Sequence, residues 1–280
     1  MFFNAKQHVY LISVFKDSMS RIDSDSSLQQ SVASSIASQQ FIAEGTIIAL
    51  PKPLYAESAQ VIVTKNRSFE AARPYAEQGL KIAVLNFASS TNPGGGVTSG
   101  ASAQEECLCR VSTLYPCLKV ESMWDLFYAP HRKARNPLHN DDIIYTKDVI
   151  VFKDDDYQLL PKPFPVDVIT CAAPTLREQS SNRYNPSDGD KAPDITPEYL
   201  LALHEKRGRQ ILSAAAANGA QVIILGAFGC GAFRNDPAVV AQAYTNILPE
   251  YLHYFRTIEF AVYCRPLSPQ NFDAFKKIIV

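Results

Sequence analysis

The stretch LNFASSTNPGGGVTSGASAQEECLCR, residues 85–110, carries the strongest signals for fold and function in this chain. Three consecutive glycines at residues 94–96 follow a proline at the end of an apolar run, and the triplet QEE stands at residues 104–106. Glycines let a ligand approach the backbone closely because no Cβ stands in the way. Two adjacent carboxylates just beyond such a turn are candidates for acid–base chemistry. The stretch therefore predicts a binding cleft with a reaction inside it.

The apolar run before the glycines is one of a series of strand candidates that alternate with helical patterns. Several of these runs are continuously apolar, which suits strands buried on both faces. Strands are expected at residues 47–50, 60–64, 81–87, 149–152, 166–171, 221–228 and 257–263, and helices at residues 68–78, 103–115, 198–218 and 237–255. This alternation predicts an α/β sandwich around a mostly parallel sheet.

The chain divides into an extension and one domain. Residues 1–45, rich in Ser, Gln and Ala, are expected to form an N-terminal helical extension with a flexible part at residues 23–27, and residues 46–280 form the domain. Two polar, turn-rich segments, residues 130–142 and 179–194, are expected to be loops. The second is either a lid or an insertion, because long loops in compact domains are often one or the other.

Composition limits the class of protein. The chain has 280 residues, of which 46% are hydrophobic, so it can bury a full core. Its formal net charge of -1 argues against a protein that coats nucleic acid, because that function needs many phosphate-neutralising cations. The six cysteines form no CxxC pair and lack zinc-site spacing, so we expect reduced thiols and no metal. Neither a secretory signal nor a run of ~18–20 apolar residues is found, so we expect an intracellular, soluble protein in the cytoplasm, with the nucleus as an alternative.

The first glycine loop follows the strand expected at residues 81–87. In open α/β sheets, ligands collect at the carboxyl ends of the strands, and Asn92 offers an amide there. Acidic residues in a first helical turn also stabilise the helix, by ~0.3–1 kcal/mol each, so Glu105 and Glu106 could serve only that purpose. The neighbouring glycines favour the functional interpretation, because they would leave the carboxylates facing a cleft. The loop is neither GxxxxGK[ST] nor GxGxxG, so neither nucleotide hydrolysis nor dinucleotide redox chemistry has motif support.

A second glycine loop, GAFGCGAFRNDP at residues 226–237, also follows an apolar strand. Its backbone N–H groups and the helix that begins at Asp236 suit a diphosphate cradle. Phe228 and Phe233 could stack on a sugar or base, or could simply be core residues of a tight strand–helix crossover. Because two such loops occur in one chain, we favour the binding interpretation.

Together these residues resemble the macrodomain superfamily and, within it, the microbial-type poly(ADP-ribose) glycohydrolases. The signature of that family is GGG, a spacer, and QEE, which stand here at residues 94–96, 97–103 and 104–106. The likeness covers roughly residues 62–262, and residues 1–45 look like the helical extension of these proteins. The resemblance implies a three-layer α/β/α macrodomain-like sandwich with a mixed, mostly parallel sheet.

The resemblance also implies roles for individual residues. Glu106 corresponds to the catalytic acid, and Glu105 to the residue that orients the ribose hydroxyls. The implied ADP-ribose-binding residues are Asn92, Gly94, Gly95, Gly96, Gln104, Gly229, Cys230, Gly231, Ala232 and Phe233. No cofactor or metal is implied, and no motif places the adenine contacts.

The reaction implied is hydrolysis of the ribose–ribose O-glycosidic bond, which releases ADP-ribose. Such bonds break through an oxocarbenium-like transition state, and most glycosidases flank the bond with two carboxylates. Adjacent residues on a helix point about 100° apart, so Glu105 and Glu106 cannot readily form such a pair. We therefore expect one working acid, Glu106, with a raised pKa, which protonates the leaving oxygen and then deprotonates water.

Two alternatives stay open. The chain could be a reader that binds ADP-ribose without cleaving it, since fold does not fix function. It could also remove ADP-ribose from another acceptor, a protein side chain or a nucleic acid. The expected partners are ADP-ribose or poly(ADP-ribose) on modified proteins, with no membrane, nucleic acid only as an acceptor, and a monomeric enzyme. Basic residues that could bind an acceptor, or only solvate the surface, are Arg110, His131, Arg132 and Arg234.

Overall fold

The computed structural model describes residues 5–264 and 268–279, and its centre is a seven-stranded sheet. The strands lie in the order β1-β4-β5-β3-β6-β7-β2. Strand β4 runs antiparallel to both of its neighbours, and the other pairs are parallel, so the predicted mixed, mostly parallel sheet is confirmed. The strands are β1 Gln40–Ile42, β2 Gln60–Thr64, β3 Ile82–Phe87, β4 Ile143–Lys153, β5 Leu159–Cys171, β6 Val222–Leu225 and β7 Thr257–Ala261.

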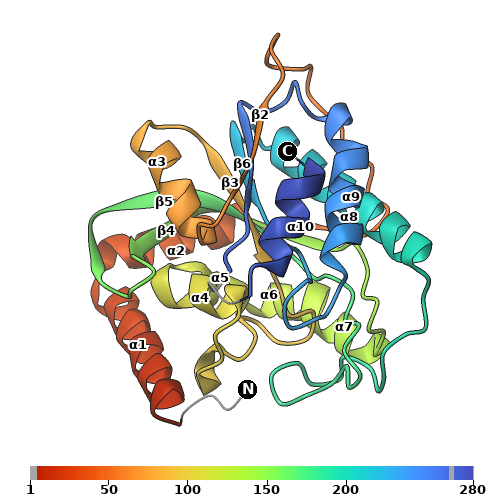
Figure 1. The fold of residues 1–280 in the computed structure, drawn as a ribbon. Coiled ribbons are helices and arrows are strands. Elements are labelled where there is room, and N and C mark those ends of the chain that lie inside the picture. The colour runs from red at the N-terminus through yellow and green to blue at the C-terminus, as the bar shows by residue number, and fades with distance from the viewer. Residues whose placement is uncertain (1–4, 265–267, 280) are drawn as a thin grey trace.

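Helices cover both faces of this sheet, which gives the predicted three layers (Figure 1). Successive side chains of a strand point to opposite faces. Ala83 and Leu85 therefore join the core under α8, α9 and α10, whereas Ile82 and Val84 join the core under α1, α3, α4 and α5. The helices are α1 Ala5–Ser24, α2 Ser26–Ala37, α3 Ser68–Glu77, α4 Gln104–Val111, α5 Leu114–Leu118, α6 Glu121–Met123, α7 Ala129–Ala134, α8 Pro197–Ala217, α9 Pro237–Ile247 and α10 Gln270–Ile279. Short 3-10 turns span Val97–Ser99 and Leu248–Glu250, and a π-helical turn spans Trp124–Tyr128.

The predicted elements differ from the structure mainly where the chain makes long-range contacts. The strand expected at residues 47–50 is absent, and Ile47 is 95% exposed there. Strands β4 and β5 are longer than predicted, because they pair as a long antiparallel hairpin, and the first residues of β5 are mostly exposed. Strand β1 and helix α10 were not predicted.

Two predicted helices end earlier than expected. The helix expected at residues 103–115 stops at Val111, where extended Ser112 bridges to Val151 of β4, and resumes as α5. The helix expected at residues 237–255 ends at Ile247 and continues as a 3-10 turn at Leu248–Glu250. This turn contains Pro249, which has no N–H for a helical hydrogen bond. In the segment expected to be a loop at residues 130–142, helix α7 extends to Ala134.

The N-terminal segment packs against the same core as the rest of the chain. Helices α1 and α2 meet at Asp25, whose carboxylate accepts hydrogen bonds from Ser27 N at 2.8 Å and Leu28 N at 3.3 Å. The flexible part expected at residues 23–27 is therefore a capped helix junction, since the Asp side chain satisfies the first N–H groups of α2. Strand β1 then pairs with β4 at the edge of the sheet. The division into residues 1–45 and 46–280 stays a prediction.

Buried polar contacts also hold α1 in place. The ammonium of Lys153, only 2% exposed, lies 2.7 Å from both Asp17 and Ser18. The Ser18 hydroxyl donates to the carbonyl of Arg110 at 2.5 Å. Because Arg110 belongs to α4, this chain of contacts ties α1 to the helix that begins with QEE. None of the helices in residues 5–264 and 268–279 combines the length and the hydrophobicity of a membrane span.

A buried ion pair joins α8 to the loop just before β4. The Arg207 guanidinium lies 2.8 Å from Asp141, and both side chains are at most 2% exposed. It also donates to the carbonyls of Ala172 at 2.6 Å and Leu138 at 3.2 Å. Without Arg207, the buried carboxylate of Asp141 would keep only the half-exposed Lys206, whose ammonium lies 2.8 Å from it, and both carbonyls would lose a buried donor. Breaking a buried pair in this way is strongly destabilising.

The substitution Arg207→Met should therefore lower the free energy of unfolding by about 3–5 kcal/mol in urea titrations. Arg209→Met is the matched control, because Arg209 lies on the same helix and pairs with Glu250 at 2.8 Å, but at side-chain exposures of 41% and 46%. Exposed pairs contribute about 1 kcal/mol or less. Equal losses in the two variants would contradict this account of Arg207.

Candidate active site

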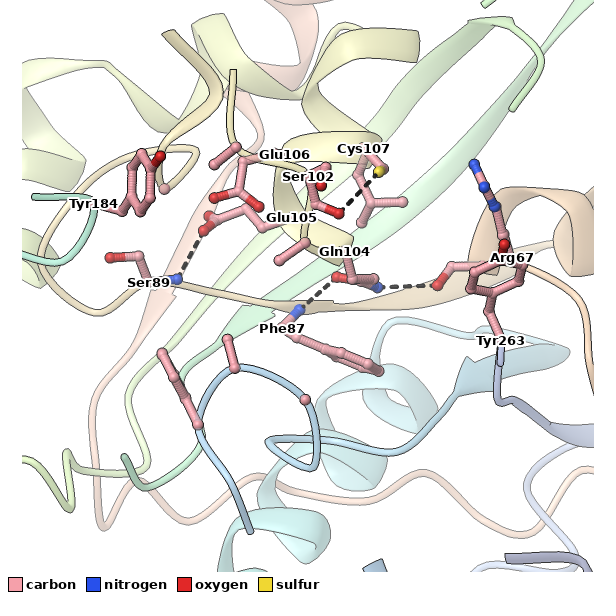
Figure 2. A pocket seen from close by; sticks show the side chains of 18 of the residues that line it. Arg67, Phe87, Ser89, Ser102, Gln104, Glu105, Glu106, Cys107, Tyr184 and Tyr263 are labelled. Carbon is pink, nitrogen blue, oxygen red and sulfur yellow. Dashed lines mark hydrogen bonds between the residues drawn. The ribbon is translucent and has the colours of Figure 1, made fainter. Parts of the chain in front are cut away.

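A cavity of about 630 Å³ opens at the carboxyl ends of β3, β6 and β7. Its walls include the two glycine loops, the start of α4, the loop at residues 179–194 and the segments that follow β2 and β7, with further residues from α1, the β4–β5 turn and α10. Figure 2 shows Tyr184, Glu105 and Glu106 at one end, and Arg67 and Tyr263 at the other. The parallel strands thus bring together loops that are far apart in the sequence, as expected for open α/β sheets.

Glu105 is held on both carboxylate oxygens. Its Oε2 accepts from the backbone N of Ser89 at 2.7 Å, and its Oε1 accepts from the amide of Asn86 at 3.3 Å. Burial raises the pKa of Glu105 well above its ordinary value, and the neighbouring charge of Glu106 adds to this. The prediction that the pair faces a cleft agrees with this geometry, since both residues line the cavity.

Glu106 is held on one oxygen only. Its Oε1 accepts from the backbone N of Gly96 at 2.8 Å. Its Oε2 is buried and has no hydrogen-bond partner in the described part of the chain. Buried polar atoms are nearly always paired in native proteins, so Glu106 Oε2 stands out by its unused capacity for a hydrogen bond. Burial raises the pKa of Glu106.

Each glycine of the triple leaves room for a neighbouring side chain. Gly95 has φ +57°, and a Cβ there would lie 2.4 Å from Glu106 Oε1. A Cβ on Gly96 would lie 2.3 Å from the ring of Tyr184, and one on Gly94 would lie 2.7 Å from that of Tyr115. Of the three, Gly95 is the one that lines the cavity in the described structure. Binding of ADP-ribose by Gly94 and Gly96 stays a prediction.

Two amide side chains assigned to the ligand make contacts within the protein. Asn92 Nδ2 donates to the carbonyls of Gly95 and, at 3.3 Å, Tyr184, which braces the glycine loop. Gln104 Oε1 accepts from Phe87 N at 2.9 Å, and its Nε2 donates to Leu85 O at 2.7 Å. Gln104 thereby ties α4 to the end of β3 (Figure 2). Gln104 also lines the cavity, and ligand contact by either residue stays a prediction.

The second glycine loop contributes Gly229, Gly231, Ala232 and Phe233 to the cavity wall, whereas Cys230 is not among its lining residues. An unassigned residue of the same motif, Asn235, organises this loop. Its buried amide donates to the carbonyl of Pro174 at 2.7 Å and to that of Gly229 at 3.1 Å. His204 Nε2 lies 2.8 Å from its Oδ1 and fixes the amide orientation, because only an N–H can pair with that oxygen. In the sequence, the signal for this role was the presence of a polar residue, Asn235, just after the glycines of the loop.

The far end of the cavity was not predicted. The Arg67 guanidinium stacks on the ring of Tyr263 at 4.6 Å, where the segments after β2 and β7 meet. Asp155 lies 3.7 Å from Arg67, and burial raises its pKa to about 6. In the sequence, Arg67 and Tyr263 could have been found by their positions shortly after two strands. Adjacent parallel strands, such as β2 and β7, end at the same edge of the sheet, where ligands bind.

The four basic residues considered for an acceptor lie in different surroundings. Arg110 and His131 are buried. Arg132 Nε donates to the carbonyl of Thr91 at 2.6 Å, behind the first glycine loop. Arg234 is exposed beside Phe233. Among the described residues no group of three or more His, Cys, Asp or Glu side chains is placed to hold a metal, and the metal-free site stays a prediction.

Fold and site together define a macrodomain-like α/β domain with a carboxylate pair in a glycine-walled cavity. Residues 13–154, about half of the chain, match the family described as "Microbial-type PARG, catalytic domain". The chain therefore belongs to the microbial-type poly(ADP-ribose) glycohydrolase (PARG) family. The match begins within α1, so it includes most of the N-terminal helices that were expected to be an extension.

Solved structures of the family are similar over nearly the whole chain. Poly(ADP-ribose) glycohydrolase from Thermomonospora curvata is 29% identical, with a TM-score of 0.83, over 96% of this chain and 98% of that one. The Deinococcus radiodurans enzyme, solved in complex with ADP-ribose, is 34% identical, with a TM-score of 0.75, over 89% and 96%. The T. curvata enzyme bound to the inhibitor ADP-HPD is 30% identical, with a TM-score of 0.78, over 96% and 98%. A search of the curated proteins found no match.

The contact between Gly95 and Glu106 can be tested with one methyl group. Gly95→Ala should lower hydrolytic activity at least 100-fold, because its Cβ displaces the Glu106 carboxylate and small misplacements at a reacting centre are costly. Gly219→Ala is the matched control: Gly219 also has positive φ, at +74°, but a Cβ there meets nothing within 4 Å. Both variants carry backbone strain, measured as a fall in Tm. If Gly95→Ala kept the activity of Gly219→Ala, the carboxylate would not depend on this glycine.

The buried carboxylates also predict a pH effect on stability. The pKa of Glu106 is raised in the folded state, so its contribution to stability is complete below about pH 4.5 and is lost as the pH rises through the folded pKa. Glu106→Gln should therefore raise Tm relative to wild type, with a gain that grows between pH 4 and pH 8. Glu121→Gln, at the exposed start of α6, should show no such trend. A gain that is constant or shrinks with pH would contradict the buried charge.

Proposed function

We propose that Glu106 is the single general acid and base with which this glycohydrolase cleaves the ribose–ribose bond of poly(ADP-ribose) and releases ADP-ribose. The observation that supports this proposal is the unpartnered, buried Oε2 of Glu106 at the wall of the cavity. A general acid must carry a proton near neutral pH, and burial raises the pKa of Glu106 in that direction.

The two carboxylates differ in their partners, which supports different roles for them. Burial and the neighbouring charge of Glu106 raise the pKa of Glu105 well above its ordinary value, but Glu105 accepts hydrogen bonds on both oxygens, and these favour its ionised form. Glu106 accepts one hydrogen bond, on Oε1, and its Oε2 has no partner among the described residues, so we assign the transferable proton of the pair to Glu106 Oε2. The remaining lone pairs of Glu105 are then free to accept ribose hydroxyls.

The reaction follows in two proton transfers. As the bond from the anomeric carbon to the leaving oxygen breaks, Glu106 Oε2 gives its proton to that oxygen, and positive charge develops on the ribose. The ionised Glu106 then takes a proton from a water molecule, whose oxygen attacks the anomeric carbon. The products are ADP-ribose and the shortened polymer, and Glu106 is again protonated.

The second glycine loop is proposed to hold the diphosphate. Gly229, Gly231 and Ala232 line the same cavity as Glu106, and backbone N–H groups of such loops bind phosphate oxygens. Phe233 is proposed to pack against the ribose. The complex of the D. radiodurans enzyme with ADP-ribose supports ADP-ribose as the ligand of this chain.

Glu106→Gln should lower the rate at which ADP-ribose is released from poly(ADP-ribose) by about 10²–10⁴-fold, because the general acid is lost. Calorimetry should show that ADP-ribose binding is kept, since the amide has nearly the shape of the carboxyl group. Glu121→Gln is the control and should retain full activity.

The alternatives correspond to other outcomes of the same experiment. Tight binding of ADP-ribose by wild type without turnover of the polymer would indicate a reader, or an enzyme for ADP-ribose on another acceptor. Full activity in Glu106→Gln would reject the single-acid mechanism.

A further inference from the structure

The loop at residues 179–194 crosses the catalytic end of the cavity. Tyr184 at its tip packs so closely on Gly96 that a Cβ there would lie 2.3 Å from the ring. The carbonyl of Tyr184 also accepts from Asn92 Nδ2 at 3.3 Å. The loop therefore contacts the triple-glycine loop directly. Figure 2 shows the Tyr184 ring beside the carboxyl groups of Glu105 and Glu106.

One carboxylate in this loop, that of Asp188, is completely buried and gathers partners from three other segments. Its Oδ1 lies 2.7 Å from His139 Nε2 and accepts from Ser90 Oγ at 3.1 Å. Its Oδ2 accepts from Thr175 Oγ1 at 3.0 Å and lies 3.3 Å from the Arg177 guanidinium. Asp188 therefore joins the loop to the segment after β3, the segment after β5 and the loop before β4.

Asp188 and its partners form one buried cluster. The second ring nitrogen of His139, Nδ1, lies 2.7 Å from the carbonyl of Ala173, so the ring is held from both sides. Asp188 also lies 3.3 Å from the permanently charged Arg177 guanidinium. Removing the carboxylate would leave this guanidinium and the His139 ring without their acceptor in the interior, which is costly.

From Asp188, contacts lead to both glutamates. Ser90, which donates to Asp188, directly follows Ser89, whose backbone N holds Glu105 at 2.7 Å. Tyr184, on the same loop as Asp188, packs on Gly96, whose backbone N holds Glu106 at 2.8 Å. The 179–194 loop thus supports the backbone of both N–H donors, at Ser89 and Gly96, that orient the two carboxylates.

We propose that Asp188 is a positioning residue for catalysis: it anchors the 179–194 loop so that this loop holds the triple-glycine loop in the conformation that orients Glu105 and Glu106. Asp188 acts through Ser90 and Tyr184 rather than on the substrate. The proposal rests on the proposed function of Glu106 and adds to it a requirement outside the glycine and QEE motifs.

Asp188→Asn tests the anchor with little change of shape. It removes the negative charge that faces Arg177 and places an N–H among groups that need an acceptor. We expect kcat for polymer hydrolysis to fall about 10- to 100-fold with a smaller change in KM, because the carboxylates are misplaced in the bound complex. Asp190→Asn is the matched control: it lies on the same loop, 83% exposed, paired only with the exposed Arg135 in the described structure.

The pH profile separates positioning from a merely structural role. When the loop loosens and water reaches Glu106, its raised pKa should relax downwards, so the alkaline limb of kcat should move to lower pH in Asp188→Asn. Loss of folding alone lowers the active fraction without moving that limb. Urea unfolding of each variant gives the folded fraction by which kcat is corrected.

Ser90→Ala is the second variant, since it removes a single hydrogen bond and keeps the ion pair. It should lower kcat in the same direction, and the double variant should lose less than the product of the two single losses. An unmoved alkaline limb and unchanged corrected kcat in Asp188→Asn, with Glu106→Gln inactive, would overturn this proposal alone. Full activity of Glu106→Gln would instead overturn the proposed function.

Discussion

The burial of two adjacent carboxylates at the start of one helix is the constraint on which the rest of the site depends. Taken out of water, Glu105 and Glu106 are costly unless donors meet them. The backbone N–H groups of Ser89 and Gly96 are those donors, so the chain between them must fold back over α4. Glycine at position 95 follows from this, because a side chain there would occupy the space of the Glu106 carboxyl group.

The sheet supplies the rigid frame for this arrangement. Strand β3 lies at its centre between β5 and β6, fully buried except at its last residue, and delivers the glycine loop to the carboxyl edge. Gln104 joins the frame to the site, since its amide bonds to the backbone of β3 on both sides of Asn86. The first residue of QEE thus fixes where the helix begins, and the two that follow are placed by it.

The sequence predicted those features whose causes are local. The continuous apolar runs around residues 60–64 and 81–87 predicted β2 and β3, and the spacing of GGG and QEE placed both carboxylates in the cavity. Strand β1 was missed because three residues form a strand only by pairing with β4. Asp188 was missed because a polar, turn-rich segment gives no sign that one of its carboxylates is buried among Ser90, Thr175 and His139. The same limit applies to Gln104 and Asn92, whose type indicated hydrogen bonding but not the partner.

Burial links the proposed acid chemistry of Glu106 to the loop at residues 179–194. A helix N-terminus carries partial positive charge, which by itself lowers the pKa of a carboxyl group there. Burial acts in the opposite direction and must prevail if Glu106 is to hold a proton near neutral pH. Since Glu106 lies at the wall of an open cavity, that burial depends on the segments packed over it, and Tyr184 on the 179–194 loop is one of them. The proposed general acid and the proposed anchor therefore depend on each other: the 179–194 loop, packed on the glycine loop beside Glu106, would help to exclude the water that lowers the pKa of this carboxyl group.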